Sequence, residues 1–216
     1  MKAILFGSIG TLIETSDLQR EAFNRAFKEA GLDWYWDQED YTKLLKKSGG
    51  TKRIEDFAEK NNTTVDAKKI RARKTEIYNN KITQTFISPR EGVLDVLQYA
   101  LKNNIKIGFV TSTTIDNIES VFKTLNNKIS KDDFDFIGNN NLINYPKPSP
   151  DIYVKALNSL KLNSYDCIAI EDTVESALSA YNAKIECVAF PGLFHIEDDF
   201  SFCLKKVNKL DVSIFK

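Results

Sequence analysis

The amino-acid sequence predicts an α/β protein with a parallel sheet and an all-helical insert after the first strand. Short apolar runs recur along the chain, and each ends at small or polar residues before a helix-like pattern. Residues 16–85 break this alternation, because they hold several helical patterns and no convincing strand. Strands that alternate with helices imply βαβ units and a parallel sheet.

The expected strands are short runs of apolar residues, as buried parallel strands usually are. The first run is followed by Gly7, the second by Thr111, the third by Glu171 and the fourth by Pro191. These four runs are Lys2–Phe6, Ile105–Val110, Cys167–Ile170 and Ile185–Phe190.

The helical insert contains four patterns, over residues 20–30, 41–46, 52–61 and 67–80. Pro89 then breaks the helical pattern, and a helix from Glu91 to Leu101 returns the chain to the sheet. We therefore expect a Rossmann-like core from residues 1–15 and 86–216, with residues 16–85 as the insert.

Composition excludes several classes of protein. With 42% apolar and 11% aromatic residues among 216, the chain can bury a core and is not disordered. Its 30 Lys and Arg balance 30 Asp and Glu, so no net charge attracts nucleic acid or a membrane surface. The apolar start is too short for a signal peptide or a membrane span. We expect a cytoplasmic monomer.

The three cysteines, Cys167, Cys187 and Cys203, have no CxxC spacing and are odd in number. This predicts neither a disulfide framework nor a zinc site, and we interpret all three as packing residues.

Polar groups follow three of the expected strands, where parallel sheets bind ligands. Ser8 follows the first, Thr111 and Ser112 the second, and Glu171 with Asp172 the third. A further loop carries a lysine between prolines, Pro146-Lys147-Pro148. Each group alone is usually a helix cap or a surface turn. Together they are the groups that hold a phosphate beside a divalent cation.

In this order the residues resemble the four motifs of the haloacid dehalogenase superfamily. The matching segments are Ala3–Leu12, Gly108–Ser112, Lys147–Asp151 and Ile170–Thr173, the last continued by Ala177–Ala183. The resemblance implies that Thr111, Ser112 and Lys147 bind phosphate and that Asp172 and Glu171 bind magnesium.

The insert is similar to the cap of the β-phosphoglucomutase branch, and most of all to CbbY-like sugar-bisphosphate phosphatases. Glu21–Asn24, Gly31–Asp37, Gly49–Ile54 and Arg73–Ile77 carry this similarity. In such caps, basic residues reach the distal phosphate of the substrate, which implies this role for Arg53, Lys52 and Lys74. For Lys52 and Lys74 the alternative is a charged, solvent-exposed helix surface.

The first motif of this family carries two aspartates, and this chain has neither. The resemblance places the nucleophile, also a magnesium ligand, at Gly7 and the general acid and base at Ile9. Phosphoryl transfer through an aspartyl-phosphate needs that first carboxylate. Its loss should cost about a million-fold in turnover and should weaken magnesium binding to Asp172 and Glu171.

Ser8 is the neighbouring candidate for a substitute nucleophile, but serine needs an activating base. The adjacent position is the apolar Ile9, and on an extended segment Ser8 would point to the opposite face. A carboxylate from another segment, such as Glu14, has no better basis.

These residues are compatible with two functions. The first is a pseudoenzyme that binds a small phosphorylated sugar without attacking it. The second is an atypical or slow magnesium-dependent sugar-phosphate phosphatase that uses other residues.

Overall fold

A computed structural model describes residues 1–46, 49–85, 87–125 and 128–216. The chain divides into two compact units. The core unit comprises Met1–Glu14 and Phe86–Lys216, and the helical unit comprises Thr15–Thr85. Residue 86, where the sequence predicted the return to the core, lies outside the described residues.

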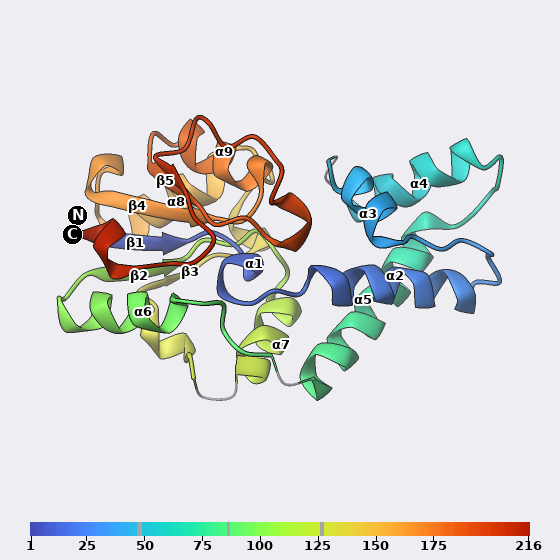
Figure 1. Cartoon of the computed structure of the whole chain (residues 1–216), viewed down its shortest axis with the longest axis horizontal. Coiled ribbons are helices and arrows are strands. Elements are labelled where there is room, and N and C mark those ends of the chain that lie inside the picture. The colour runs from blue at the N-terminus through green and yellow to red at the C-terminus, as the bar shows by residue number, and fades with distance from the viewer. Residues whose placement is uncertain (47–48, 86, 126–127) are drawn as a thin grey trace. The chain divides into compact units, whose positions relative to one another are not determined.

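The core unit is built on a six-stranded, fully parallel sheet with strand order β3-β2-β1-β4-β5-β6 (Figure 1). The central strand, β1, is buried along its whole length, as expected for a run flanked by helices on both faces. The strands are β1 Ala3–Phe6, β2 Lys106–Phe109, β3 Phe136–Ile137, β4 Cys167–Glu171, β5 Glu186–Ala189 and β6 Lys205–Lys206.

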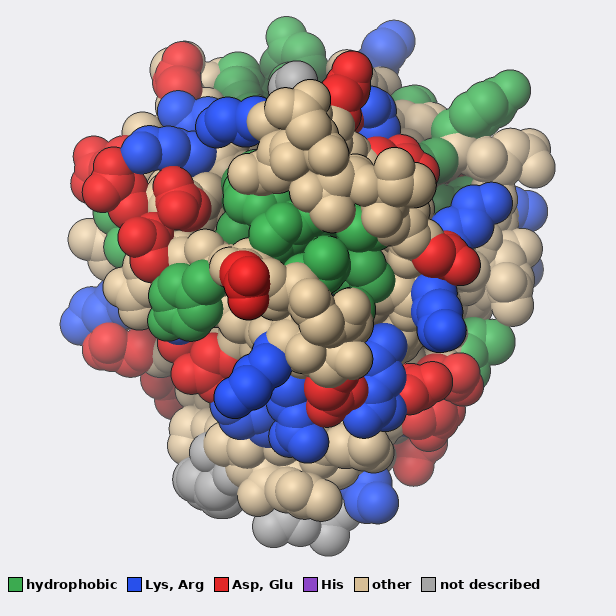
Figure 2. All heavy atoms as spheres, turned by 90° about the vertical axis from the view of Figure 1, so that its right-hand side faces the viewer, with side chains coloured by type: hydrophobic (Ala, Val, Ile, Leu, Met, Phe, Trp, Pro, Cys, Tyr) green, Lys and Arg blue, Asp and Glu red, His purple; other side chains and the backbone are tan. Residues whose placement is uncertain are grey.

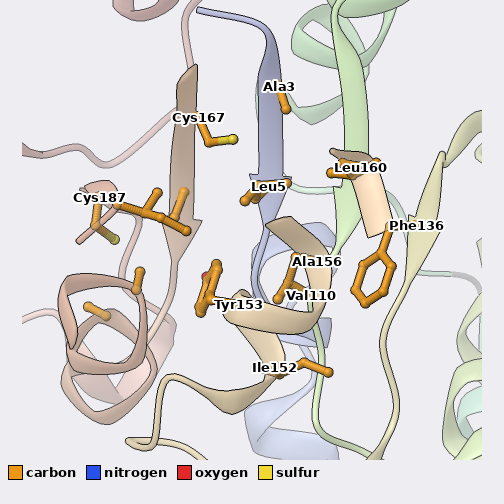
Figure 3. Packing of buried hydrophobic residues seen from close by; sticks show 14 of the residues in the cluster. Ala3, Leu5, Val110, Phe136, Ile152, Tyr153, Ala156, Leu160, Cys167 and Cys187 are labelled. Atoms are coloured by element: carbon orange, nitrogen blue, oxygen red, sulfur yellow. The ribbon is translucent and has the colours of Figure 1, made fainter. Parts of the chain in front are cut away.

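Helices cover both faces of this sheet. In Figure 1, α6 and α7 lie on one face, and α8 and α9 lie on the other. Tyr153 and Ala156 of α8 pack against Leu5 of β1 and Val110 in the main apolar cluster (Figure 3). The helices are α1 Ile9–Leu12, α6 Val93–Lys102, α7 Ile115–Leu125, α8 Asp151–Leu160 and α9 Val174–Asn182.

The helical unit is held together by an aromatic cluster. Trp36 is fully buried, and its ring lies 4.6 Å from that of Phe27 and 5.0 Å from that of Phe23. Asn24 anchors the same segment, since its side chain exchanges two hydrogen bonds with the backbone of Trp36. The helices are α2 Ser16–Glu29, α3 Gln38–Leu45, α4 Gly50–Lys60 and α5 Ala67–Gln84.

Figure 2 shows one face of the helical unit, where basic and acidic side chains are interspersed around a hydrophobic centre. Charges of the helical unit also pair locally, such as Arg73 with Glu29 and Glu76. Along the described part of the chain, no helix is both long and apolar enough to cross a bilayer.

The predicted fold class is confirmed, and each of the four predicted strands has a counterpart in the sheet. The two edge strands, β3 and β6, were not predicted. Each has only two residues, which is too short for an apolar pattern to stand out.

Candidate phosphate site

The candidate site lies at the carboxyl end of the sheet, and strand register explains why its residues meet. Phe6 of β1 is paired with Phe109 of β2 on one side and with Ile170 of β4 on the other. The residues that follow these positions, including Gly7 and Glu171, therefore emerge side by side. Ligands of parallel sheets bind at such an edge.

Glu171 and Lys147 form a buried ion pair at this edge. The Lys147 ammonium donates hydrogen bonds to Oε1 of Glu171 and to the Gly7 carbonyl, each at 2.5 Å. The Tyr153 hydroxyl donates to the same Oε1 at 2.6 Å. Burial raises the pKa of Glu171 to about 7, against the opposing effect of Lys147. Among the described residues, Oε2 of Glu171 has no hydrogen-bond partner.

The carboxylate of Glu171 fills the space beside Gly7. A Cβ atom added to Gly7 would lie 1.9 Å from Oε1 of Glu171 and 2.4 Å from Oε2. No side chain can start at position 7 while Glu171 has this conformation. The carboxylate next to Lys147 therefore comes from β4, and β1 contributes only a backbone carbonyl.

Ser8 and Asp172 form a second polar pair. The Ser8 hydroxyl donates to Oδ1 of Asp172 at 2.6 Å. The sequence showed only the apolar Ile9 next to Ser8, whereas the Asp172 carboxylate reaches Ser8 from the end of β4. Gly10 leaves room for it, because a Cβ there would lie 1.8 Å from Oδ2.

Thr111 and Ser112 follow β2 at the same edge of the sheet. Thr111 is buried, and its hydroxyl accepts a hydrogen bond from the Thr113 backbone at 3.3 Å. Ser112 is half-buried. The threonine hydroxyl thus orders the turn after β2. It accepts in this bond, so its own hydrogen is not used there and can be donated elsewhere.

Two residues near the site were missed by sequence reasoning. Tyr153 reads as an ordinary apolar position of α8, and nothing in its spacing indicates that its hydroxyl reaches Glu171. Arg90 holds the first-motif loop, since it donates to the carbonyls of Gly10, Phe190 and Pro191 at 2.6–2.9 Å. Its position next to Pro89 indicated only that the helical pattern ends there.

These residues fit a magnesium ion poorly. Gly7 has no side chain, and its carbonyl already accepts from Lys147. One oxygen of Asp172 accepts from Ser8, and the unpaired oxygen of Glu171 is enclosed. No cluster of three or more His, Cys, Asp or Glu suited to a metal occurs among the residues described. Magnesium prefers octahedral oxygen ligands, which this set does not supply.

The helical unit contains its own group of basic residues. Lys74 is only 2% exposed, donates to Gln19 at 3.0 Å and lies 4.9 Å from the ring centres of Phe23 and Tyr78. Burial, with the charges of Arg71 and Arg53, holds the pKa of Lys74 well below its usual range. The charges of Arg71 and Arg53 act on Lys74, so the three basic side chains form one group in the helical unit.

The predicted cap residues differ in their surroundings. Arg53 is buried, donates to the Leu44 carbonyl at 2.9 Å and lies near Lys74. Lys52 is exposed and forms an ion pair with Asp56 one turn along α4, a pairing typical of helix surfaces. Arg71, which was not predicted, joins the group instead.

Comparison with known proteins identifies the class to which this fold and site belong. The family model of haloacid dehalogenase-like hydrolases matches residues 4–190. The chain belongs to this family.

Curated relatives then narrow the branch. Protein CbbY of Cereibacter sphaeroides is 32% identical over 204 residues, covering 93% of this chain and 89% of the relative. Protein CbbY of Rhodobacter capsulatus is 33% identical, with 93% and 90% coverage. Both support the CbbY-like branch.

Solved structures agree with this assignment. A crystal structure of CbbY from Rhodobacter sphaeroides in complex with phosphate has a TM-score of 0.85 and 30% identity, and covers 97% of this chain and 94% of that one. A mutant CbbY from the same organism, in complex with xylulose-(1,5)bisphosphate, gives the same values.

Proposed function

We propose that this protein is a pseudoenzyme of the CbbY-like branch that binds a phosphorylated sugar without hydrolysing it. One observation carries the proposal: the carboxylate of Glu171 takes up the space at Gly7 where a nucleophile would begin. Glu171 cannot replace the nucleophile in this position, because both its oxygens are buried or already bonded. In-line attack needs an exposed carboxylate facing phosphorus.

Phosphate binding in the core unit is supported by the residues that remain. Lys147 has three N–H groups, of which two bond Gly7 and Glu171. The third is available to a phosphate oxygen, and the hydroxyls of Thr111 and Ser112 add neutral donors.

A ligand with a second phosphate is supported by Lys74, Arg53 and Arg71. Lys74 is buried with no carboxylate among the charges that shift its pKa. Its contacts are the neutral Gln19 side chain and the rings of Phe23 and Tyr78, so an anion bound beside it would stabilise the charged ammonium. The related CbbY structure with xylulose-(1,5)bisphosphate makes sugar bisphosphates the first ligands to test.

The test is a thermal-shift and calorimetric titration with inorganic phosphate, sugar monophosphates and xylulose 1,5-bisphosphate, each with and without magnesium. The expected result is stabilisation that magnesium does not increase. An absence of stabilisation by every phosphate compound would contradict the binding function. Rapid hydrolysis of any of these compounds would contradict the pseudoenzyme.

A second function, slow hydrolysis, is favoured by the hydrogen bond from Ser8 to Asp172. Asp172 could accept the serine proton during attack, although a carboxylate is a weak base for a hydroxyl. A phosphatase assay with the Ser8→Ala variant separates the two functions. Slow turnover that disappears in Ser8→Ala and Asp172→Asn would favour the enzyme over the pseudoenzyme.

A further inference from the structure

Two cysteines on neighbouring segments, Cys187 and Cys203, lie side by side in the core unit. Cys187 belongs to β5, and Cys203 lies two residues before the start of β6. The Leu204 amide donates to the Cys187 carbonyl at 2.8 Å, which holds the two segments together. The two thiols lie close enough for each to shift the pKa of the other, and the Cys187 thiol donates to the Val188 carbonyl at 3.7 Å. All three cysteines of the chain are free thiols.

The two thiols differ in exposure and in acidity. Cys187 is 3% exposed and lies in the apolar cluster, on the side remote from Phe136 (Figure 3), whereas Cys203 is half-buried. The neighbouring Cys187 thiol lowers the pKa of Cys203, against the effect of burial. The nearby Cys203 thiol, together with burial, raises the pKa of Cys187. Cys203 is therefore the thiol that ionises first.

A small oxidant can reach this pair. Both cysteines line a surface cavity of about 630 Å³. Its wall includes Tyr181 and Phe202, whose rings meet edge to face at 5.8 Å. The cavity is open enough for water or a peroxide.

We propose that Cys187 and Cys203 form a redox-reactive dithiol site, which a hydroperoxide converts into an intramolecular disulfide. The Cys203 thiolate attacks the peroxide, so that an S–O bond forms and the O–O bond breaks, leaving a sulfenic acid and one alcohol or water. The Cys187 sulfur then attacks the Cys203 sulfur. Its thiol proton leaves with the hydroxyl as water, and the S–S bond forms. The two sulfurs lose two electrons, which the peroxide gains.

The disulfide would close a loop over residues 188–202 and tie the segment before β6 to β5. Cross-links of this kind stabilise a fold mainly by restricting the unfolded chain. We therefore expect the oxidised protein to melt at a higher temperature than the reduced protein.

The test treats the full chain with hydrogen peroxide and maps its peptides without reduction. The expected product links Cys187 to Cys203, leaves Cys167 as a free thiol and returns to the starting mass with dithiothreitol. Cys203→Ser should abolish the link. Cys167→Ser is the matched control and should leave it intact, because the Cys167 thiol instead donates to the Asn163 carbonyl.

Two results would overturn the proposal. One is oxidation of Cys203 to sulfenic or sulfinic acid with no link to Cys187 in the wild-type protein. The other is a link that involves Cys167 or a second chain. Because both results are read from the wild-type protein, neither depends on a variant that must fold, and neither depends on the proposed phosphate function.

Discussion

The carboxylate beside Lys147 is the residue-scale feature that distinguishes this site. Glu171 reaches it from β4 and fills the space left by Gly7. An isolated buried lysine would be costly, so a chain without the first-motif aspartate gains stability when Glu171 takes this position. Glu171 thus occupies the space beside Gly7. An aspartate introduced at position 7 would have to displace the Glu171 carboxylate.

The first prediction concerns the double variant Gly7→Asp/Ile9→Asp. The new side chain at position 7 cannot coexist with the present Glu171 conformation. Since the carboxylate ends a flexible side chain, we expect it to move away and become free to bind a cation. Magnesium should then stabilise the double variant but not the wild type, and magnesium-dependent phosphatase activity should appear.

Thermal shift with magnesium chloride and an assay on sugar phosphates check this prediction. Ile9→Asp alone serves as the control, because it leaves Glu171 in place and should respond to magnesium like the wild type. If magnesium does not stabilise the double variant either, the prediction that Glu171 moves away and binds the cation is wrong.

The second prediction concerns Tyr153→Phe. Its hydroxyl donates at 2.6 Å to the fully buried Glu171, so its removal leaves that carboxylate with fewer donors. We expect the free energy of unfolding to fall by about 1–3 kcal/mol. Urea denaturation measures it. Tyr165→Phe, at an 81% exposed tyrosine, should change stability by less than about 0.5 kcal/mol. Equal effects of the two variants would rule out the buried bond as the cause.

At the scale of elements, apolar runs were enough to predict the main strands but not their register. Gly7 and Glu171 are separated by most of the core sequence, and only the pairing of Phe6 with Ile170 brings them together. The same applies to Ser8 with Asp172 and to Tyr153 of α8. Sequence patterns indicate which residues are buried, whereas side-chain partners across strands depend on tertiary packing that no local pattern encodes.

The third prediction concerns Lys74 on α5. Its pKa is lowered in the folded state by burial, so between that pKa and the ordinary 10.5 the unfolded chain binds more protons. The stability of the protein should therefore rise with pH across this window. Lys74→Met should remove this slope and stabilise the ligand-free protein by roughly 1–3 kcal/mol at neutral pH.

Denaturation at several pH values measures the slope. Lys68→Met, at an exposed lysine of the same helix, is the matched control and should leave both stability and slope nearly unchanged. A destabilised Lys74→Met variant would show that the ammonium is fully compensated in the folded protein.

For the whole molecule, the family could be predicted from four short motifs because their order along the chain is specific. The assignment of individual cap residues was less complete. Lys52 and Arg53 are neighbours in the sequence, yet one is paired on the surface and the other is buried near Lys74. The sequence allowed a surface role for Lys52 and Lys74 but not for Arg53, and the structure buries Arg53 and Lys74 while it leaves Lys52 exposed.

The last prediction follows from the two groups of basic residues, one in each unit. Inorganic phosphate needs only the core residues, whereas the resemblance of the helical unit to family caps implies that the basic group containing Lys74 binds the second phosphate of a bisphosphate. Lys147→Gln should therefore weaken both ligands, and Lys74→Met should weaken only the bisphosphate. Loss of one charge-assisted hydrogen bond corresponds to roughly a 10-fold to 100-fold rise in Kd. Calorimetry with both ligands measures these changes, and Lys68→Met is again the control. If Lys74→Met weakened inorganic phosphate as strongly as the bisphosphate, Lys74 would not be specific for a second phosphate, and its role would be to support the fold.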